Sequence, residues 1–408
     1  MSNKKTFCIL PWIHLFASTT GTLRPCCVSK EFDYRYKIHK EGIEEFWNSK
    51  HMRELRKSML NGERSDVCIT CWDKEKNGDS HSKRLGELNQ WKNKLNIDDL
   101  IELTNDDGSV IDNIISYDLR LGNLCNLKCI MCNPNSSSKW LEDKAILGKY
   151  ENTGFSKHTL PNLKWPDGEE LWNYLNLNSE KIRLLQFAGG EPLLHKKHYH
   201  LLENLVKSKC SKNIFLKYNT NITQLPDKIF DLWNEFKRVD LWCSIDGLGE
   251  LNDYIRFPSK WKDILDSLYK LDKTPKHINV RINTAISALN IEYIPEFYNF
   301  IAKNNFSKIG RTEWYEGVHI APDIVYDPFH LNMRILPKCA KEKITKKIQK
   351  HLETVDNLQY IEQMNYVLSY MNFEDWHNKH YDEFLQYITD IEKIRGNKYP
   401  YEIYPKDK

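Results

Sequence analysis

The stretch RLGNLCNLKCIMCNPN, residues 120–135, contains Cys125, Cys129 and Cys132, spaced by three and then two residues. It follows the segment IISYDLRL, which predicts a short strand. In parallel α/β folds, sites form at the carboxyl ends of the strands. Three thiolates fit an iron–sulfur cluster in which one iron lacks a protein ligand and is free to bind a small molecule. The alternative is a structural zinc ion, which would need a distant cysteine or histidine as its fourth ligand.

The wider sequence predicts alternating strands and helices from about residue 114 onward. Strands are expected at residues 114–121, 183–190, 213–220, 238–245, 278–286 and 308–317, and helices at 198–208, 225–236, 261–273 and 292–304. This alternation predicts an α/β fold with a parallel sheet of right-handed βαβ units. Six such units would form a partial (β/α)6 TIM-like barrel. Two further helices, at residues 340–355 and 381–394, predict a C-terminal helical extension.

The N-terminal region reads as a separate unit. Residues 12–27 predict a hairpin with its turn at residues 19–21, and residues 48–63 predict a helix. Ser49 is the expected N-cap of that helix, and Met52, Leu55 and Met59 are expected on one face. The predicted domains are therefore residues 1–95, 110–325 and 326–408.

Composition excludes several classes of protein. The 408 residues include 40% hydrophobic residues, enough for a substantial core, and 59 basic residues nearly balance 56 acidic ones. No nucleic-acid or membrane-surface partner is therefore expected. The chain has no apolar run long enough for a transmembrane helix and no secretory signal, so we expect a cytoplasmic protein.

Three motifs together resemble the radical S-adenosylmethionine (SAM) superfamily: CNLKCIMC at residues 125–132, FAGGEPLL at 187–194 and WCSIDG at 242–247. They occur in the order typical of that family, and the resemblance covers about residues 114–320. It implies that Cys125, Cys129 and Cys132 bind a [4Fe–4S] cluster whose open iron binds SAM.

The same resemblance implies a set of SAM contacts. Gly189 and Gly190 would let the backbone approach the methionyl group, and Glu191 would accept hydrogen bonds from its ammonium. Ser244 and Arg256 correspond to a pair that holds the SAM carboxylate in related enzymes. Further candidates are Asp246 for the ribose, Met131 for the adenine in place of the usual aromatic residue, and the amides Asn219, Asn221 and Asn283. Asn219 and Asn221 belong to a YNTN segment in which Ile222 replaces a glycine of the family.

The N-terminal cysteines resemble the auxiliary-cluster domains called SPASM and twitch. Gly21 precedes Cys26 by five positions, as the glycine of a hairpin turn does in those domains, although here the domain precedes the barrel. The resemblance implies a twitch-like domain with a second [4Fe–4S] cluster on Cys8, Cys26, Cys68 and Cys71, with Cys27 as a spare or a substitute for Cys26. A four-thiolate zinc site is the alternative.

The resemblance implies a radical SAM enzyme that cleaves SAM reductively to a 5′-deoxyadenosyl radical and abstracts hydrogen from a peptide or protein side chain. The auxiliary cluster would assist electron transfer, and flavodoxin or ferredoxin would supply electrons. The alternatives are the same chemistry on a sugar or nucleotide derivative, and a non-catalytic iron–sulfur or zinc interaction protein. Glu313, Tyr315 and His319 follow the sixth predicted strand and are candidates either to face the substrate or to be structural.

Overall fold

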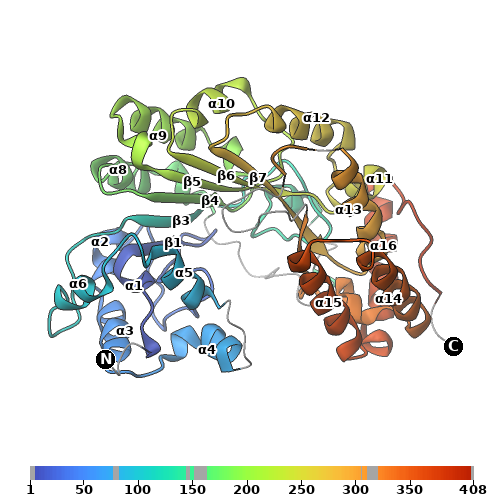
Figure 1. Cartoon of the computed structure of the whole chain (residues 1–408), viewed down its shortest axis with the longest axis horizontal. Coiled ribbons are helices and arrows are strands. Elements are labelled where there is room, and N and C mark those ends of the chain that lie inside the picture. The colour runs from blue at the N-terminus through green and yellow to red at the C-terminus, as the bar shows by residue number, and fades with distance from the viewer. Residues whose placement is uncertain are drawn as a thin grey trace. The chain divides into compact units, whose positions relative to one another are not determined.

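The computed structural model describes residues 5–76, 82–143, 148–150, 163–304, 306–309 and 320–405. Contacts divide the chain into two compact units (Figure 1). The first contains residues 1–122, 161–217 and 235–237, and the second contains 123–160, 218–234 and 238–408. Strands and helices alternate in both, so the predicted α/β fold with a parallel sheet is confirmed. The predicted domains at 1–95, 110–325 and 326–408 stay a prediction.

The first unit contains the strand order β2-β1-β3-β4, followed by the start of β5 (Phe215–Thr220). The predicted hairpin is present, since β1 (His14–Ala17) pairs antiparallel with β2 (Leu23–Arg24). β1 also pairs in parallel with β3 (Ser116–Arg120), which pairs in parallel with β4 (Leu184–Ala188). The N-terminal hairpin therefore extends the sheet.

Local sequence explains the helices of the first unit. In α3 (Lys50–Leu60), the Ser49 side chain accepts a hydrogen bond from the Met52 amide, and Met52, Leu55 and Met59 are buried, as predicted. The other helices are α1 (Leu10–Ile13), α2 (Gly42–Trp47), α4 (Ile69–Lys76), α5 (Lys83–Trp91), α6 (Ile97–Glu102), α8 (Glu170–Leu177) and α9 (Lys196–Lys207).

The second unit continues from the end of β5 through β6 (Arg238–Ser244), β7 (Ile278–Ile286) and β8 (Ile320–Ile324). β6 pairs in parallel with β7, and β7 pairs in parallel with β8. The helices between and beside these strands are α10 (Asp227–Trp233), α11 (Gly249–Ile255), α12 (Trp261–Asp272) and α13 (Ile294–Lys303).

The sixth predicted strand differs in position from β8. Residues 310–319 lie outside the described residues, and Ile309 forms one parallel bridge with Val280. β8 begins at Ile320 and contains Pro322, a residue that argues against a strand unless the strand lies at an edge. β8 is the last strand in the order, where proline is tolerated.

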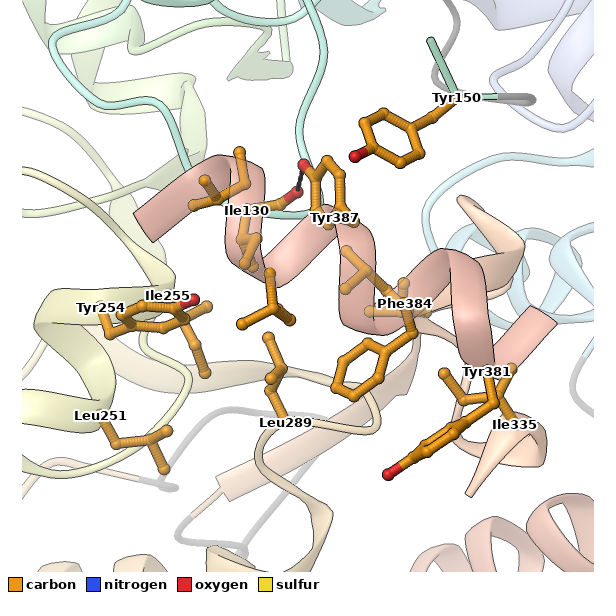
Figure 2. Close-up of a cluster of buried hydrophobic side chains, with 14 of the residues drawn as sticks. Ile130, Tyr150, Leu251, Tyr254, Ile255, Leu289, Ile335, Tyr381, Phe384 and Tyr387 are labelled. Carbon is orange, nitrogen blue, oxygen red and sulfur yellow. Dashed lines mark hydrogen bonds between the residues drawn. The ribbon is translucent and has the colours of Figure 1, made fainter. Parts of the chain in front are cut away.

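The C-terminal extension is helical, with α14 (Lys338–Leu352), α15 (Leu358–Phe373) and α16 (His377–Arg395) (Figure 1). One face of α16 contributes Tyr381, Phe384 and Tyr387 to a buried hydrophobic cluster that also contains Ile130 of the cysteine loop (Figure 2). Among the helices that the structure describes, none is both long enough and apolar enough to cross a membrane.

Candidate active site and auxiliary metal centre

The cysteine loop follows β3 and belongs to the second unit. The Cys132 amide donates to the Cys129 carbonyl at 2.9 Å, and the Leu127 amide donates to the Cys125 thiol at 3.5 Å. All three thiols are partly buried. Burial and repulsion from the other two thiols raise the pKa of Cys132 above its usual range. Iron binds thiolates, so cluster assembly here would release protons.

The loop is held by the last residue of α11 and by the segment that follows it. The Lys128 amide donates to the Phe257 carbonyl at 2.7 Å, and the Ile130 amide donates to the Ile255 carbonyl at 2.8 Å. Arg256 lies between these two carbonyl groups in the sequence. The two backbone bonds therefore fix the loop next to the arginine predicted to hold SAM.

Arg256 connects a buried carboxylate to a cysteine of the loop. Its Nη1 lies 3.8 Å from the Cys129 Sγ, and its Nε lies 2.8 Å from Oδ2 of the fully buried Asp246. The other Asp246 carboxylate oxygen accepts a hydrogen bond from the Ala285 amide at 2.8 Å. Asp246 thus anchors Arg256 through protein contacts, whereas its predicted ribose contact stays a prediction.

The carboxyl ends of β5, β6 and β7 bring polar side chains of the second unit toward one edge of the sheet. Ser244 of β6 is in register with Asn283 of β7. Within the described part of the chain, the buried Oδ1 atoms of Asn219 and Asn283 have no hydrogen-bond partner. A buried amide oxygen needs a partner, so these two atoms fit a polar ligand such as SAM.

The YNTN segment also supports the cysteine loop. The Asn221 side chain donates to Oδ1 of Asn126, which lies between the first two loop cysteines, at 2.9 Å. Asn126 in turn donates to the Thr223 hydroxyl at 2.8 Å. Ile222 has a φ of 49°, a left-handed backbone that a β-branched residue rarely adopts. A glycine at this position would adopt it without strain.

Met131 packs against the hydrophobic cluster that includes Tyr387 and Ile130. A flexible thioether suits such irregular surroundings. The indole nitrogen of Trp140, from the same cluster, donates to the Cys129 carbonyl at 3.0 Å. The predicted contact between Met131 and the adenine stays a prediction.

The Gly-Gly-Glu motif belongs to the first unit, where it follows β4. Gly189 has a φ of 116°, and a Cβ there would lie 2.7 Å from the Leu121 amide nitrogen, so only glycine fits. The Gly190 amide donates to the Gly122 carbonyl at 3.0 Å. Glu191 is 4% exposed, and its carboxylate accepts a hydrogen bond from the Leu193 amide at 3.2 Å. Its role toward SAM stays a prediction.

In the first unit, four cysteines line a single pocket: Cys8, Cys26, Cys68 and Cys71. They come from different elements, since Cys8 precedes α1, Cys26 follows β2, Cys68 ends a short 3₁₀ helix (Asp66–Cys68) and Cys71 lies in α4. Cys27 is not among the residues that line the pocket. The geometry therefore favours Cys26 over Cys27 as the ligand.

The hairpin turn before Cys26 requires glycine, as the resemblance implied. Gly21 has a φ of 72°, and its amide donates to the Ser18 carbonyl at 2.8 Å. A Cβ at this position would lie 3.0 Å from the ring of Trp165. The turn connects β1 to β2, and Cys26 follows β2 and lines the pocket.

The four thiols fit a metal cluster by their chemistry. Burial and the neighbouring thiols raise the pKa of Cys26 to about 11 and that of Cys68 to about 12. Bound iron would supply the positive charge that favours the thiolates. Within the described residues, no set of three or more His, Cys, Asp or Glu side chains is arranged to hold a single metal ion. Four thiols that line one pocket are the ligand set that a [4Fe–4S] cluster requires.

Two family models match this chain. The model described as the radical SAM superfamily matches residues 119–301, and an iron–sulfur cluster-binding (SPASM) domain model matches residues 8–72. Residues 119–301 are therefore a radical SAM domain. The SPASM domain lies on the N-terminal side of the radical SAM domain. The cofactors of such a pair of domains are a [4Fe–4S] cluster with SAM and an auxiliary iron–sulfur cluster.

Curated relatives of this radical SAM protein match only in part. An uncharacterised protein of Methanocaldococcus jannaschii is 28% identical over 47% of this chain and 60% of its own length. GTP 3′,8-cyclase of Campylobacter lari is 26% identical over 49% of this chain and 55% of its own length. The chain thus matches less than two thirds of either relative. Among solved structures, SuiB of Streptococcus suis bound to S-adenosylmethionine is 13% identical over 76% of this chain and 64% of its own, with a TM-score of 0.37.

Glu313, Tyr315 and His319, the candidates either to face the substrate or to be structural, lie outside the described residues. Sequence reasoning also missed side chains that bind the loop backbone, among them Trp140. The sequence feature that could have indicated this role for Trp140 is its position shortly after Cys132, the last cysteine of the loop.

Proposed function

We propose that this protein is a radical SAM enzyme that modifies a peptide or protein side chain, with its auxiliary cluster assisting electron transfer. The observation that best supports this proposal is the position of Arg256. The buried Asp246 carboxylate binds its guanidinium, which lies 3.8 Å from the Cys129 thiol of the cysteine loop. That position suits an arginine that binds the carboxylate of a small molecule seated on the neighbouring iron.

The assigned residues divide into three roles. Cys125, Cys129 and Cys132 would hold the cluster whose open iron binds SAM, and reductive cleavage of bound SAM supplies a 5′-deoxyadenosyl radical that abstracts hydrogen. Arg256 and Ser244 would hold the SAM carboxylate. Asn219 and Asn283 offer buried amide oxygens to the rest of the ligand.

The auxiliary site supports a role in electron transfer. Cys8, Cys26, Cys68 and Cys71 surround one pocket, so the chain can supply all four ligands of a [4Fe–4S] cluster. A cluster with four protein ligands has no open iron for SAM. It is suited to accept the electron that remains after hydrogen abstraction from a side chain. An external flavodoxin or ferredoxin would reduce the SAM-binding cluster.

A second candidate is the same chemistry on a nucleotide or sugar derivative. It is favoured by the similarity to GTP 3′,8-cyclase of Campylobacter lari, which is 26% identical over 49% of this chain. The two candidates share the cluster and the SAM site and differ only in the substrate.

The test is product analysis by mass spectrometry under anaerobic conditions. Reconstituted protein, dithionite and SAM should yield 5′-deoxyadenosine, and the variant with Cys125, Cys129 and Cys132 replaced by Ala should yield none. A peptide pool that raises 5′-deoxyadenosine formation and gains an oxidised product would support the peptide substrate. A response to GTP or sugar nucleotides alone would favour the second candidate, and no 5′-deoxyadenosine from cluster-loaded protein would overturn both.

A further inference from the structure

The backbone of the cysteine loop is bound by side chains from outside the loop at three consecutive carbonyls. Arg395 donates to the Lys128 carbonyl, Trp140 to the Cys129 carbonyl and Tyr387 to the Ile130 carbonyl. The Tyr387 bond is buried and 2.8 Å long (Figure 2). Since the amides of residues 128 and 130 bind the end of α11 and the segment after it, the centre of the loop is held from two sides.

Two of these three donors come from α16, which lies in the C-terminal extension. Tyr387 is 257 positions and Arg395 is 267 positions from the carbonyl that it binds. Arg395 also donates to the Tyr254 carbonyl at 3.0 Å, so one guanidinium joins the loop to α11. The extension is therefore part of the framework of the cluster loop.

The Arg395 guanidinium lies beside aromatic rings and not within ion-pair distance of a carboxylate in the described part of the chain. Its guanidinium lies 5.1 Å from the ring centre of Trp140 and 5.2 Å from that of Phe257. Across the described residues no acidic side chain forms an ion pair with it, whereas Arg256 pairs with Asp246. Burial lowers the pKa of Arg395, and Tyr387, the Cys129 thiol, Tyr254 and the Asp143 carboxylate oppose that shift. A partly buried cation beside the loop can thus interact with the charge of a group that the loop binds.

We propose that Tyr387 and Arg395 are positioning residues for the SAM-binding cluster, and that the Arg395 charge raises the reduction potential of that cluster. The inference rests on the proposed function, because it requires a cluster on Cys125, Cys129 and Cys132. A cluster gains one negative charge when it accepts an electron, so a fixed positive charge favours the reduced form. Local charge and hydrogen bonding are established determinants of such potentials.

The first test is an anaerobic redox titration followed by electron paramagnetic resonance. Arg395→Met should lower the equilibrium constant for cluster reduction by about tenfold, which is about 59 mV for a one-electron couple. Arg395→Lys keeps the charge and should restore most of this loss. Lys393→Met removes an exposed cation from the same helix and should leave the potential unchanged. Equal potentials in Arg395→Met, Lys393→Met and the native protein would overturn the electrostatic role.

The second test measures how firmly the loop holds iron and does not depend on the arginine variants folding. Tyr387→Phe removes only the hydroxyl that binds the Ile130 carbonyl, and it should release cluster iron to a chelator severalfold faster. Tyr381→Phe is the matched control, because its hydroxyl lies on the same helix but binds the Tyr404 carbonyl. Native release rates in both variants would overturn the positioning role of Tyr387.

A different result would show that the proposed function itself is wrong. In that case, replacing Cys125, Cys129 and Cys132 with Ala would leave the iron content and the resonance spectrum of the protein unchanged. If the loop holds a cluster but its reduction potential and iron-release rate do not change in the Arg395 and Tyr387 variants, only the inference drawn from α16 is refuted.

Discussion

Replacing Asp246 with Asn should weaken SAM binding through Arg256. Asp246 is fully buried, and its Oδ2 lies 2.8 Å from the Arg256 Nε, so the variant removes the only carboxylate that pairs with this arginine in the described residues. The amide keeps an oxygen for the Ala285 N–H but leaves the guanidinium without its charged anchor. Breaking a buried pair typically costs about 3–5 kcal/mol of stability. We expect the lower value, about 3 kcal/mol, because Cys129 offers Arg256 a second partner.

The expected loss of SAM affinity follows from the misplaced guanidinium. Hydrogen bonds to charged groups contribute about 1.5–3 kcal/mol, so affinity should fall by roughly tenfold to a hundredfold. Equilibrium dialysis of labelled SAM against anaerobically reconstituted protein measures it. The matched control is Asp240→Asn, since Asp240 is 1% exposed and pairs with Arg238 at 2.8 Å near the other end of β6.

The two variants separate anchoring of Arg256 from general destabilisation. Both should unfold at lower denaturant concentration, but only Asp246→Asn should bind SAM more weakly. If Asp246→Asn bound SAM as tightly as the native protein, or if Asp240→Asn lost as much affinity, the anchoring role of Asp246 would be refuted.

Three further outcomes are expected. Glu191→Gln keeps the shape of the side chain but removes its charge, so SAM affinity measured by dialysis should fall by about tenfold or more; unchanged affinity would remove Glu191 from the site. Gly189→Ala places a Cβ 2.7 Å from the Leu121 amide nitrogen and should cost about 1–3 kcal/mol in denaturant unfolding, whereas native stability would show that the backbone relaxes freely. The Cys68→Ala, Cys71→Ala double variant should still cleave SAM but lose substrate turnover; native turnover in a folded variant without its second cluster would exclude the electron-transfer role.

Features set by neighbouring residues could be predicted from the sequence. The α3 helix begins at Ser49 because that side chain caps the Met52 amide, three residues away. The spacing of Cys125, Cys129 and Cys132 is likewise local, and the second family model covers the predicted auxiliary cysteines from Cys8 to Cys71.

Features set by distant contacts could not be predicted. Pairing of β1 with β3 joins residues about a hundred positions apart, as the bond between His14 and Ser116 illustrates with a separation of 102. α15 was missed because its exposed face also carries the apolar residues Leu358, Tyr366 and Phe373, which weakens the alternation of polar and apolar positions that indicates a helix. Nothing in the local sequence around Tyr387 indicates that its hydroxyl binds the cysteine loop.

The conformation of Ile222 could be predicted from the sequence only in part. The resemblance to the family motif implied a glycine at this position, and the structure gives Ile222 a left-handed φ of 49°. Its side chain is fully buried, so apolar packing stabilises a conformation that the backbone alone disfavours.

The central claim is that the chain holds one cluster that binds SAM and a second that does not. The most direct measurement is electron paramagnetic resonance of the reduced protein with and without SAM. In the native protein, SAM should change one of two cluster signals, and that signal should be absent when Cys125, Cys129 and Cys132 are replaced by Ala. A SAM-dependent change in the signal that survives in this triple variant, or no change in either signal of the native protein, would contradict the account.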